Sequence, residues 1–175
     1  MIRTLAALSL PALALAACTT TGSSFAARDG QGTFYAADGS LRGTAALVRT
    51  GDRLTLAIAT QGLPAGQHGI HLHMTGRCDA PDFTTAGGHL NPGQHQHGTM
   101  NPAGHHLGDL PNLVVNSAGV GTLTAELGGS ASEIESALFD ADGSAIVIHA
   151  GPDDYKTDPS GNSGGRIACA ILKRT

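Results

Sequence analysis

The chain has 175 residues, of which 41% are hydrophobic and 14% are charged, with 25 glycines and no tryptophan. This length suits one domain around one core, and a glycine-rich, aromatic-poor composition favours short strands and turns over long helices. The net charge of -4 gives no reason to expect nucleic acid as a partner.

Residues 1–17 predict a signal peptide for export. Arg3 precedes an apolar run from Leu5 to Leu15, which is too short to span a bilayer and is followed by small residues. A buried N-terminal helix is the alternative interpretation. Pro11 and the sequence "TTTGSS" that follows the run disfavour such a helix.

Residues 15–18, "LAAC", resemble the lipobox of bacterial lipoproteins. The resemblance implies that Cys18 is acylated, becomes the mature N-terminus and anchors the protein to a membrane. Residues 18–30, rich in Thr, Ser, Gly and Ala, then form a flexible tether. We therefore expect a periplasmic or otherwise extracytoplasmic protein, and by analogy with other lipoproteins Thr19 favours the outer membrane.

Two cysteines, Cys78 and Cys169, remain once Cys18 is assigned to the lipid. Disulfides persist outside the cytoplasm, so we predict that these two are bonded to each other. Two free buried thiols are the alternative. A bridge that encloses so long a loop stabilises a fold by roughly 4 to 5 kcal/mol on the chain-entropy argument.

From Gly32 onward the sequence alternates between strand-like runs and turns. Leu54, Leu56 and Ile58, for example, alternate with polar or small neighbours, which is typical of a half-buried strand. The predicted strands are 33–37, 41–48, 53–60, a strand that carries His71 and His73, 112–116, 120–127, 144–149 and 166–173. Turns are expected at 38–40, 50–52 and 62–68, and one helical turn at 132–138 with Ser132 as its cap.

About eight short strands therefore make up the predicted domain, with two long irregular segments at 75–111 and 150–165. This pattern predicts an all-β fold, an eight-stranded antiparallel Greek-key barrel or sandwich with two long functional loops. Irregular segments of this length are uncommon inside compact domains and are usually functional.

Histidines gather in the first of these loops. It contains Asp109 and five of the nine histidines of the chain, namely His89, His95, His97, His105 and His106. His71 and His73, just before the loop, share one face of a strand, so two imidazoles can close on one ion. Taken alone, that pair has a solvent-facing or hydrogen-bonded alternative.

A long loop has no core of its own, so the clustered histidines indicate a metal that holds it in place. Imidazole suits zinc and copper, and a carboxylate oxygen is compatible with zinc. Because the two remaining cysteines are better used in a disulfide, we expect a site of nitrogen ligands with one oxygen.

Five motifs together resemble the copper-zinc superoxide dismutases, in particular the exported bacterial forms. They are "GIHLH", "CDAPDFTTAGGHLNP", "HGTMNPAGHHLGDLPNL", "VIHAGPDDY" and "GNSGGRIAC". They occur in order across residues 31–175, which we expect to form the dismutase domain. The resemblance implies copper and zinc as cofactors and either a monomer or a homodimer.

The resemblance also implies two sets of ligands, which spacing alone could not assign. The copper set is His71, His73, His89 and His149, and the zinc set is His89, His97, His106 and Asp109. His97 is chosen over His95 because the family ligand directly precedes glycine, and His106 over His105 because of the spacing His-x-Gly-Asp. His68, His95 and His105 are expected to be solvated, with weak accessory metal binding as the alternative.

Three further residues match functional positions of the family. Asp153 matches an aspartate that links a copper-ligand histidine to a zinc-ligand histidine, here His71 and His97. Arg166 matches the arginine that binds the anionic substrate, and Lys156 is expected to steer that substrate inward. A turn-capping role for Asp153 and a surface charge for Arg166 are the alternatives.

The implied activity is conversion of two superoxide ions and two protons into oxygen and hydrogen peroxide. In this scheme His89 bridges the two metals and delivers a proton, and Arg166 binds superoxide. A non-catalytic copper or zinc carrier on the same fold is the alternative. It would be expected if a copper histidine or Arg166 were missing, and neither is.

Overall fold

The computed structural model describes residues 27–175. The predicted signal peptide, Cys18 and most of the predicted tether lie outside the described residues. Strand β1 begins at Ala27, within the segment 18–30 that the sequence suggested as a tether. No helix in residues 27–175 is both long enough and apolar enough to cross a membrane.

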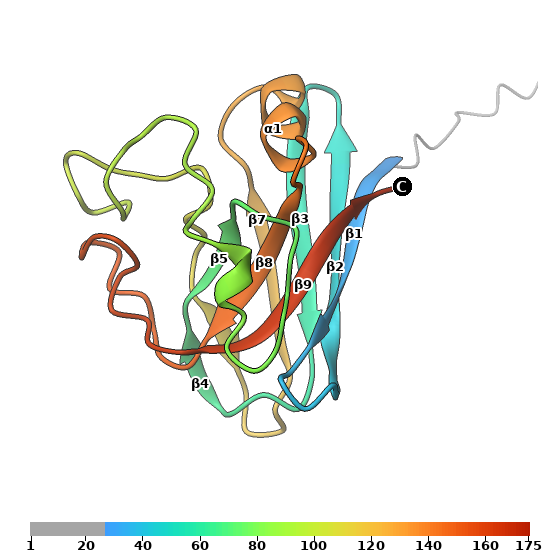
Figure 1. The fold of residues 1–175 in the computed structure, drawn as a ribbon, viewed down its shortest axis with the longest axis vertical. Helices are drawn as coiled ribbons and strands as arrows, with labels where there is room; N and C mark the ends of the chain where they lie inside the picture. Colours follow the sequence, from blue (N-terminus) through green and yellow to red (C-terminus); the bar gives the residue numbers. More distant parts are fainter. Residues whose placement is uncertain (1–26) are drawn as a thin grey trace, which may run out of the picture.

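Antiparallel strands form a single, nearly closed barrel, which confirms the predicted all-β class (Figure 1). The strands are β1 (Ala27–Tyr35), β2 (Leu41–Thr50), β3 (Arg53–Thr60), β4 (Gly66–His68), β5 (Ile70–His73), β6 (Leu113–Val115), β7 (Gly121–Glu126), β8 (Ser144–His149) and β9 (Arg166–Arg174). Their order around the sheet is β4-β6-β7-β3-β2-β1-β9-β8-β5. The two ends of this order, β4 and β5, are consecutive in the chain.

The structure has nine strands where the sequence predicts eight. The additional strand is β4, which pairs with β6 and lies in the expected turn at 62–68. Three residues are too few to show an alternating pattern. Gly69 alone separates β4 from β5, and a Cβ atom at this position would lie 2.7 Å from Cβ of Ser163. Glycine therefore allows the second long loop to pack against this junction.

Strand β8 is buried along its whole length because both of its faces are covered. Ile146 and Ile148 belong to the main core inside the barrel. Ala145 and Val147 belong to a second cluster that also includes Phe83, from the first long loop, and Cys169. This double cover fixes the end of β8, where His149 lies.

The only α-helix in the described part of the chain, α1, spans Ala131–Leu138. The prediction of Ser132 as its cap was wrong. Ser130 is the N-cap: its side chain accepts a hydrogen bond from the backbone N–H of Glu133, whose carboxylate in turn accepts from the N–H of Ser130. This reciprocal pair is a capping box.

Both long loops project from the same side of the barrel (Figure 1). The first, between β5 and β6, contains a short 3-10 helix, η1 (Thr84–Ala86). The second connects β8 to β9. Backbone N–H of Met100 donates to the carbonyl of Tyr155 across a distance of 2.9 Å. The two loops therefore form one continuous structure beside β5 and the end of β8.

Candidate metal centre

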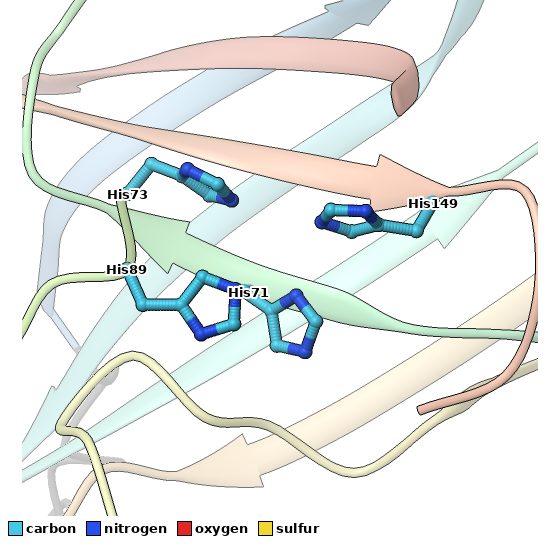
Figure 2. Close-up of side chains that lie close together, drawn as sticks. All are labelled: His71, His73, His89 and His149. Atoms are coloured by element: carbon cyan, nitrogen blue, oxygen red, sulfur yellow. The ribbon is translucent and has the colours of Figure 1, made fainter. Parts of the chain in front are cut away.

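Four imidazoles from three parts of the chain face one another (Figure 2). His71 and His73 lie on the same face of β5, as their spacing predicts, and His149 ends the neighbouring strand β8. His89 comes from the first loop and lies opposite His73 in an isolated β-bridge. One nitrogen from each of the four rings lies within 4.8 Å of the others.

Each of these rings has one nitrogen that is held and one that is free. A carbonyl or carboxylate oxygen can only accept, so the ring nitrogen facing it carries the proton. The held pairs are His71 Nε2 with Asp153 Oδ2 at 2.8 Å, His73 Nδ1 with Gly87 O at 2.9 Å, His149 Nδ1 with Gly164 O at 3.1 Å, and His89 Nδ1 with Asp109 Oδ1 at 2.9 Å.

The four remaining nitrogens are Nδ1 of His71 and Nε2 of His73, His89 and His149. All four are buried and have no hydrogen-bond partner within the described part of the chain. Leaving one buried polar atom unpaired destabilises a fold by about 1 to 3 kcal/mol, so four converging lone pairs indicate a binding site for a cation. Four nitrogen ligands fit copper, which imidazole binds well.

Burial also keeps these rings in the neutral form that a metal requires. Desolvation lowers the pKa of His73 to about 2, of His149 to about 3 and of His89 to about 4, and it lowers the pKa of His71 as well. A neutral imidazole keeps the lone pair that binds a metal, so at neutral pH a metal can bind the four unpaired nitrogens without displacing a proton from them.

A second group of ligand atoms surrounds Asp109. Oδ1 of Asp109 lies 2.9 Å from Nδ1 of His89, 2.9 Å from Nδ1 of His97 and 3.2 Å from Nδ1 of His106. Nδ1 of His106 lies 3.3 Å from Nδ1 of His89. Ligands at zinc distances in a tetrahedron are separated by about 3.3 Å, so three imidazoles and one carboxylate fit zinc here.

His89 belongs to both groups through its two nitrogens. Its Nδ1 faces the group around Asp109, and its Nε2 faces His71, His73 and His149. The ring can therefore bridge two metals. His89 is the residue to which the family resemblance assigns the bridging role.

Asp109 is held as a carboxylate. Burial opposes its ionisation, but hydrogen bonds from His89 and from the backbone N–H groups of Gly98 and His106 outweigh burial and lower its pKa well below the ordinary value. The negative charge offsets part of the positive charge that a divalent metal brings into a buried site.

Asp153 connects the two groups from outside. Its Oδ2 accepts from Nε2 of His71, and its Oδ1 lies 2.9 Å from Nε2 of His97. The side chain of Asn112 holds the backbone of Asp153 on both sides, donating to its carbonyl at 2.9 Å and accepting from its N–H at 2.8 Å. Asp153 is only 3% exposed. It therefore orients one ring of each metal site.

A cavity of about 480 Å³ opens onto the first group of histidines. His73, His89, His149 and Arg166 are among the residues that line it. The guanidinium of Arg166 donates to the carbonyl of Phe83 at 2.6 Å and to that of Gly87 at 2.8 Å. Burial lowers the pKa of Arg166, but a guanidinium stays protonated in proteins. A fixed positive charge therefore lies beside the histidines.

Four other predicted residues have different surroundings. Lys156 is exposed and is not among the residues that line this cavity, whereas Asp158 is. His68 was expected to be solvated, and this prediction was wrong. His68 is 3% exposed, and its two nitrogens contact the carbonyls of His149 at 2.8 Å and Pro64 at 2.9 Å. His95 and His105 are exposed, and His95 lines the cavity.

The predicted disulfide is confirmed: Cys78 and Cys169 are bonded to each other across a sequence separation of 91. It joins the beginning of the first long loop to β9. A larger cavity of about 730 Å³ lies beside this disulfide, on the outer side of β1, β2 and β9. None of the three groups of candidate metal ligands within the described residues lies there.

The fold and the site together define a class of protein. The sequence profile of the copper/zinc superoxide dismutase family (SODC) matches residues 41–172, and the chain belongs to this family. It is 41% identical over 135 residues to superoxide dismutase [Cu-Zn] 1 of Aquifex aeolicus, covering 75% of this chain and 79% of that one. It is 39% identical over 144 residues to the enzyme of Caulobacter vibrioides, covering 79% and 82%.

Solved structures show the same architecture. A SOD-like protein from Bacillus subtilis has a TM-score of 0.77 at 37% identity, covering 84% of this chain and 100% of that one. The Cu/Zn superoxide dismutase from Brucella abortus has a TM-score of 0.65 at 27% identity, covering 83% and 100%.

Proposed function

We propose that this protein is a superoxide dismutase that converts two superoxide ions and two protons into oxygen and hydrogen peroxide. The observation that carries the proposal is the set of four unpaired imidazole nitrogens beside a cavity that also contains Arg166. Family membership alone would not be enough, because one similar structure is described only as a SOD-like protein.

The candidate metal ligands and Arg166 have different roles in the proposed reaction. His71, His73, His89 and His149 would hold copper, which supplies the one-electron oxidation and reduction when it is bound. His97, His106 and Asp109, with His89, would hold zinc and so order the first loop. Arg166 binds and orients the anionic substrate. Nε2 of His89, when it is not engaged as a ligand, can hold a proton and deliver it to the reduced substrate.

A metal carrier is the second candidate function, because a carrier also needs clustered ligands. Arg166 argues against it, since a cation beside the copper ligands repels incoming metal and attracts a small anion. Its guanidinium is fixed by two backbone carbonyls rather than neutralised by a carboxylate. This arrangement suits recognition of an anion.

The experiment measures superoxide consumption by a soluble fragment of residues 22–175, oxidised and loaded with one copper and one zinc. We expect turnover near the diffusion limit, which His149→Ala abolishes because one copper ligand is lost. His105→Ala is the matched control, since His105 is exposed and does not line the cavity. A fragment that binds both metals but consumes no superoxide would establish the carrier instead.

We further propose that residues 1–17 are a lipoprotein signal peptide and that Cys18 carries the lipid, which places the domain in the periplasm with the outer membrane favoured. The support is the order of charge, apolar run and "LAAC" in the sequence. Labelling of the full chain with a radioactive fatty acid in a bacterial host tests the proposal. Cys18→Ser should abolish the label.

The assembly state has two alternatives by family resemblance, a monomer and a homodimer. Sedimentation equilibrium of the metal-loaded fragment at several concentrations distinguishes them. A mass of one chain at every concentration would exclude the homodimer.

A further inference from the structure

Asp158, in the second long loop, contributes a negative charge to the cavity through which the substrate must pass. Its side chain lines the cavity together with Arg166 and His149, and it is the only acidic residue among the lining residues. A carboxylate at the entrance to an anion-binding site opposes the attraction exerted by Arg166. Such a residue needs a compensating role.

The structure shows what Asp158 does there. Backbone N–H of His97, a candidate zinc ligand, donates to Oδ1 of Asp158 across 2.6 Å. Hydrogen bonds to a carboxylate are shorter and about twice as strong as those between neutral groups. Asp158 therefore fixes the main chain of a ligand that lies in the other loop.

Three carboxylates hold His97, each at a different atom. Asp109 contacts its Nδ1, Asp153 contacts its Nε2, and Asp158 accepts from its backbone N–H. Two of the three, Asp153 and Asp158, come from the second loop. The ring and the backbone of His97, which is fully buried, are thus positioned from separate directions.

Apart from the contact of Asp153 with the His97 ring, other hydrogen bonds between the loops do not involve a candidate copper or zinc ligand. The N–H of Met100 donates to Tyr155 O at 2.9 Å, and Nδ2 of Asn101 donates to Lys156 O at 3.5 Å. Both involve residues that follow His97. The hydrogen bond to Asp158 is the one by which the second loop holds the backbone of the ligand itself.

We propose that Asp158 is a positioning residue that fixes the backbone of His97 for zinc binding, although its charge slows the approach of superoxide. The effect on superoxide rests on the proposed dismutase function, whereas the role in zinc binding does not. Asp158→Asn separates the two effects, because an amide oxygen still accepts a hydrogen bond but carries no charge. Asp158→Ala removes both.

Asp154→Asn is the matched control. Asp154 is an exposed carboxylate of the same loop, and its side chain accepts hydrogen bonds from Lys156, Thr157 and Asn162 of that loop. It does not line the cavity. Asp154→Asn therefore removes one negative charge from the same loop without removing a contact to a candidate metal ligand.

The first measurement is the rate at which zinc passes from the zinc-loaded protein to a coloured chelator. We expect Asp158→Ala to release zinc at least about tenfold faster, the range seen when a partner of a metal ligand is removed, and Asp158→Asn to stay close to the wild type. Retention by Asp158→Asn shows that the loss in Asp158→Ala comes from the missing acceptor. Wild-type release by Asp158→Ala would overturn the positioning role.

The second measurement is the rate constant for superoxide at several ionic strengths. Asp158→Asn should be about two- to threefold faster than the wild type at low salt and should converge with it as salt screens the charge. If the rate constant of Asp158→Asn rises no more than that of Asp154→Asn, the charge of Asp158 does not slow the approach of superoxide. If even the wild type consumes no superoxide, the proposed function fails while zinc release still decides the positioning role.

Discussion

Asp153 serves two histidines at once, and only a carboxylate has two oxygens that can both accept. In Asp153→Asn one oxygen is replaced by an NH₂ group, which cannot accept from the second ring. We expect zinc affinity to fall by about 10- to 100-fold, as is usual when a partner of a metal ligand is lost. Competition with a chelator at equilibrium measures the zinc affinity. Asp154→Asn should bind zinc normally, and equal affinities in all three proteins would contradict the bridging role.

Arg166 depends on the fork shape of its guanidinium as well as on its charge. It donates to two carbonyls, of Phe83 and Gly87, while it faces the cavity. Lysine keeps the charge, but its ammonium is a compact group on a flexible stem and cannot reproduce the rigid, planar fork that reaches both carbonyls while facing the cavity. We expect Arg166→Lys to lower kcat/KM for superoxide by about tenfold, the effect of losing about 1.4 kcal/mol in the transition state.

Copper content is the control for this variant, because Arg166 is not among the candidate ligands. Metal analysis of Arg166→Lys should give the same copper and zinc as the wild type. A variant that loses copper in proportion to its activity would show that the arginine supports the metal site rather than the substrate.

Some residues of the site could be predicted from the sequence and others could not. Strand periodicity places His71 and His73 on one face, whereas the choice of His97 over its neighbour His95 depends on the family resemblance, in which the ligand directly precedes glycine. Asn112 and His68 could not be predicted. Their roles depend on contacts with backbone atoms 41 and 81 residues away, and no local pattern carries that information.

The N-cap of helix α1 can be tested by mutation. Ser130 caps the helix through the backbone of Glu133, whereas Ser132, the residue predicted from sequence, lies inside it. We expect Ser130→Ala to lower the free energy of unfolding by about 1 kcal/mol and Ser132→Ala to change it by a few tenths. Urea denaturation measures both. Equal losses in the two variants would contradict the assigned cap.

Strands such as β3 were predictable because one face is buried and the other is less so, although β8 is buried on both faces. β3 and β7 follow the expected ranges closely. β4 escaped prediction because its three residues show no periodicity, and the ends of β1 depend on pairing with β2 and β9 rather than on local sequence. The paths of the two long loops also could not be predicted, since ligand contacts and hydrogen bonds between the loops define them.

Acid should destabilise the whole molecule when metals are absent. His73, His89 and His149 have folded-state pKa values of about 2, 4 and 3, below the ordinary value of 6.5. Between about pH 6.5 and pH 4 the unfolded chain therefore binds protons that the folded chain does not. The free energy of unfolding falls as the pH falls through this window, by up to about 1.4 kcal/mol per pH unit for each histidine.

Urea denaturation of the metal-free protein between pH 7.5 and pH 4.5 checks this prediction. Stability should be nearly constant above pH 7 and should decrease steadily below pH 6.5. Bound metal ions compete with protons for the same nitrogens, so the loaded protein should resist acid further. A flat profile for the metal-free protein down to pH 5 would contradict the burial of neutral histidines.

β5 is the last strand of the sheet, and the first long loop completes its hydrogen bonding. Leu72 accepts from the N–H of Leu90 and donates to the carbonyl of Gly108. His71 lies opposite Asp109, and His73 lies opposite His89, so ligands of both metal sites contact this edge.

The covered edge links metal loading to solubility. If the loop separates from β5 when metal is lost, the strand presents unpaired N–H and C=O groups, which are a template for pairing with another chain. Metal-depleted protein should then form oligomers through this edge, whereas the loaded protein stays dispersed. Bound zinc and copper would in that case protect the protein from aggregation, in addition to any role they have in catalysis.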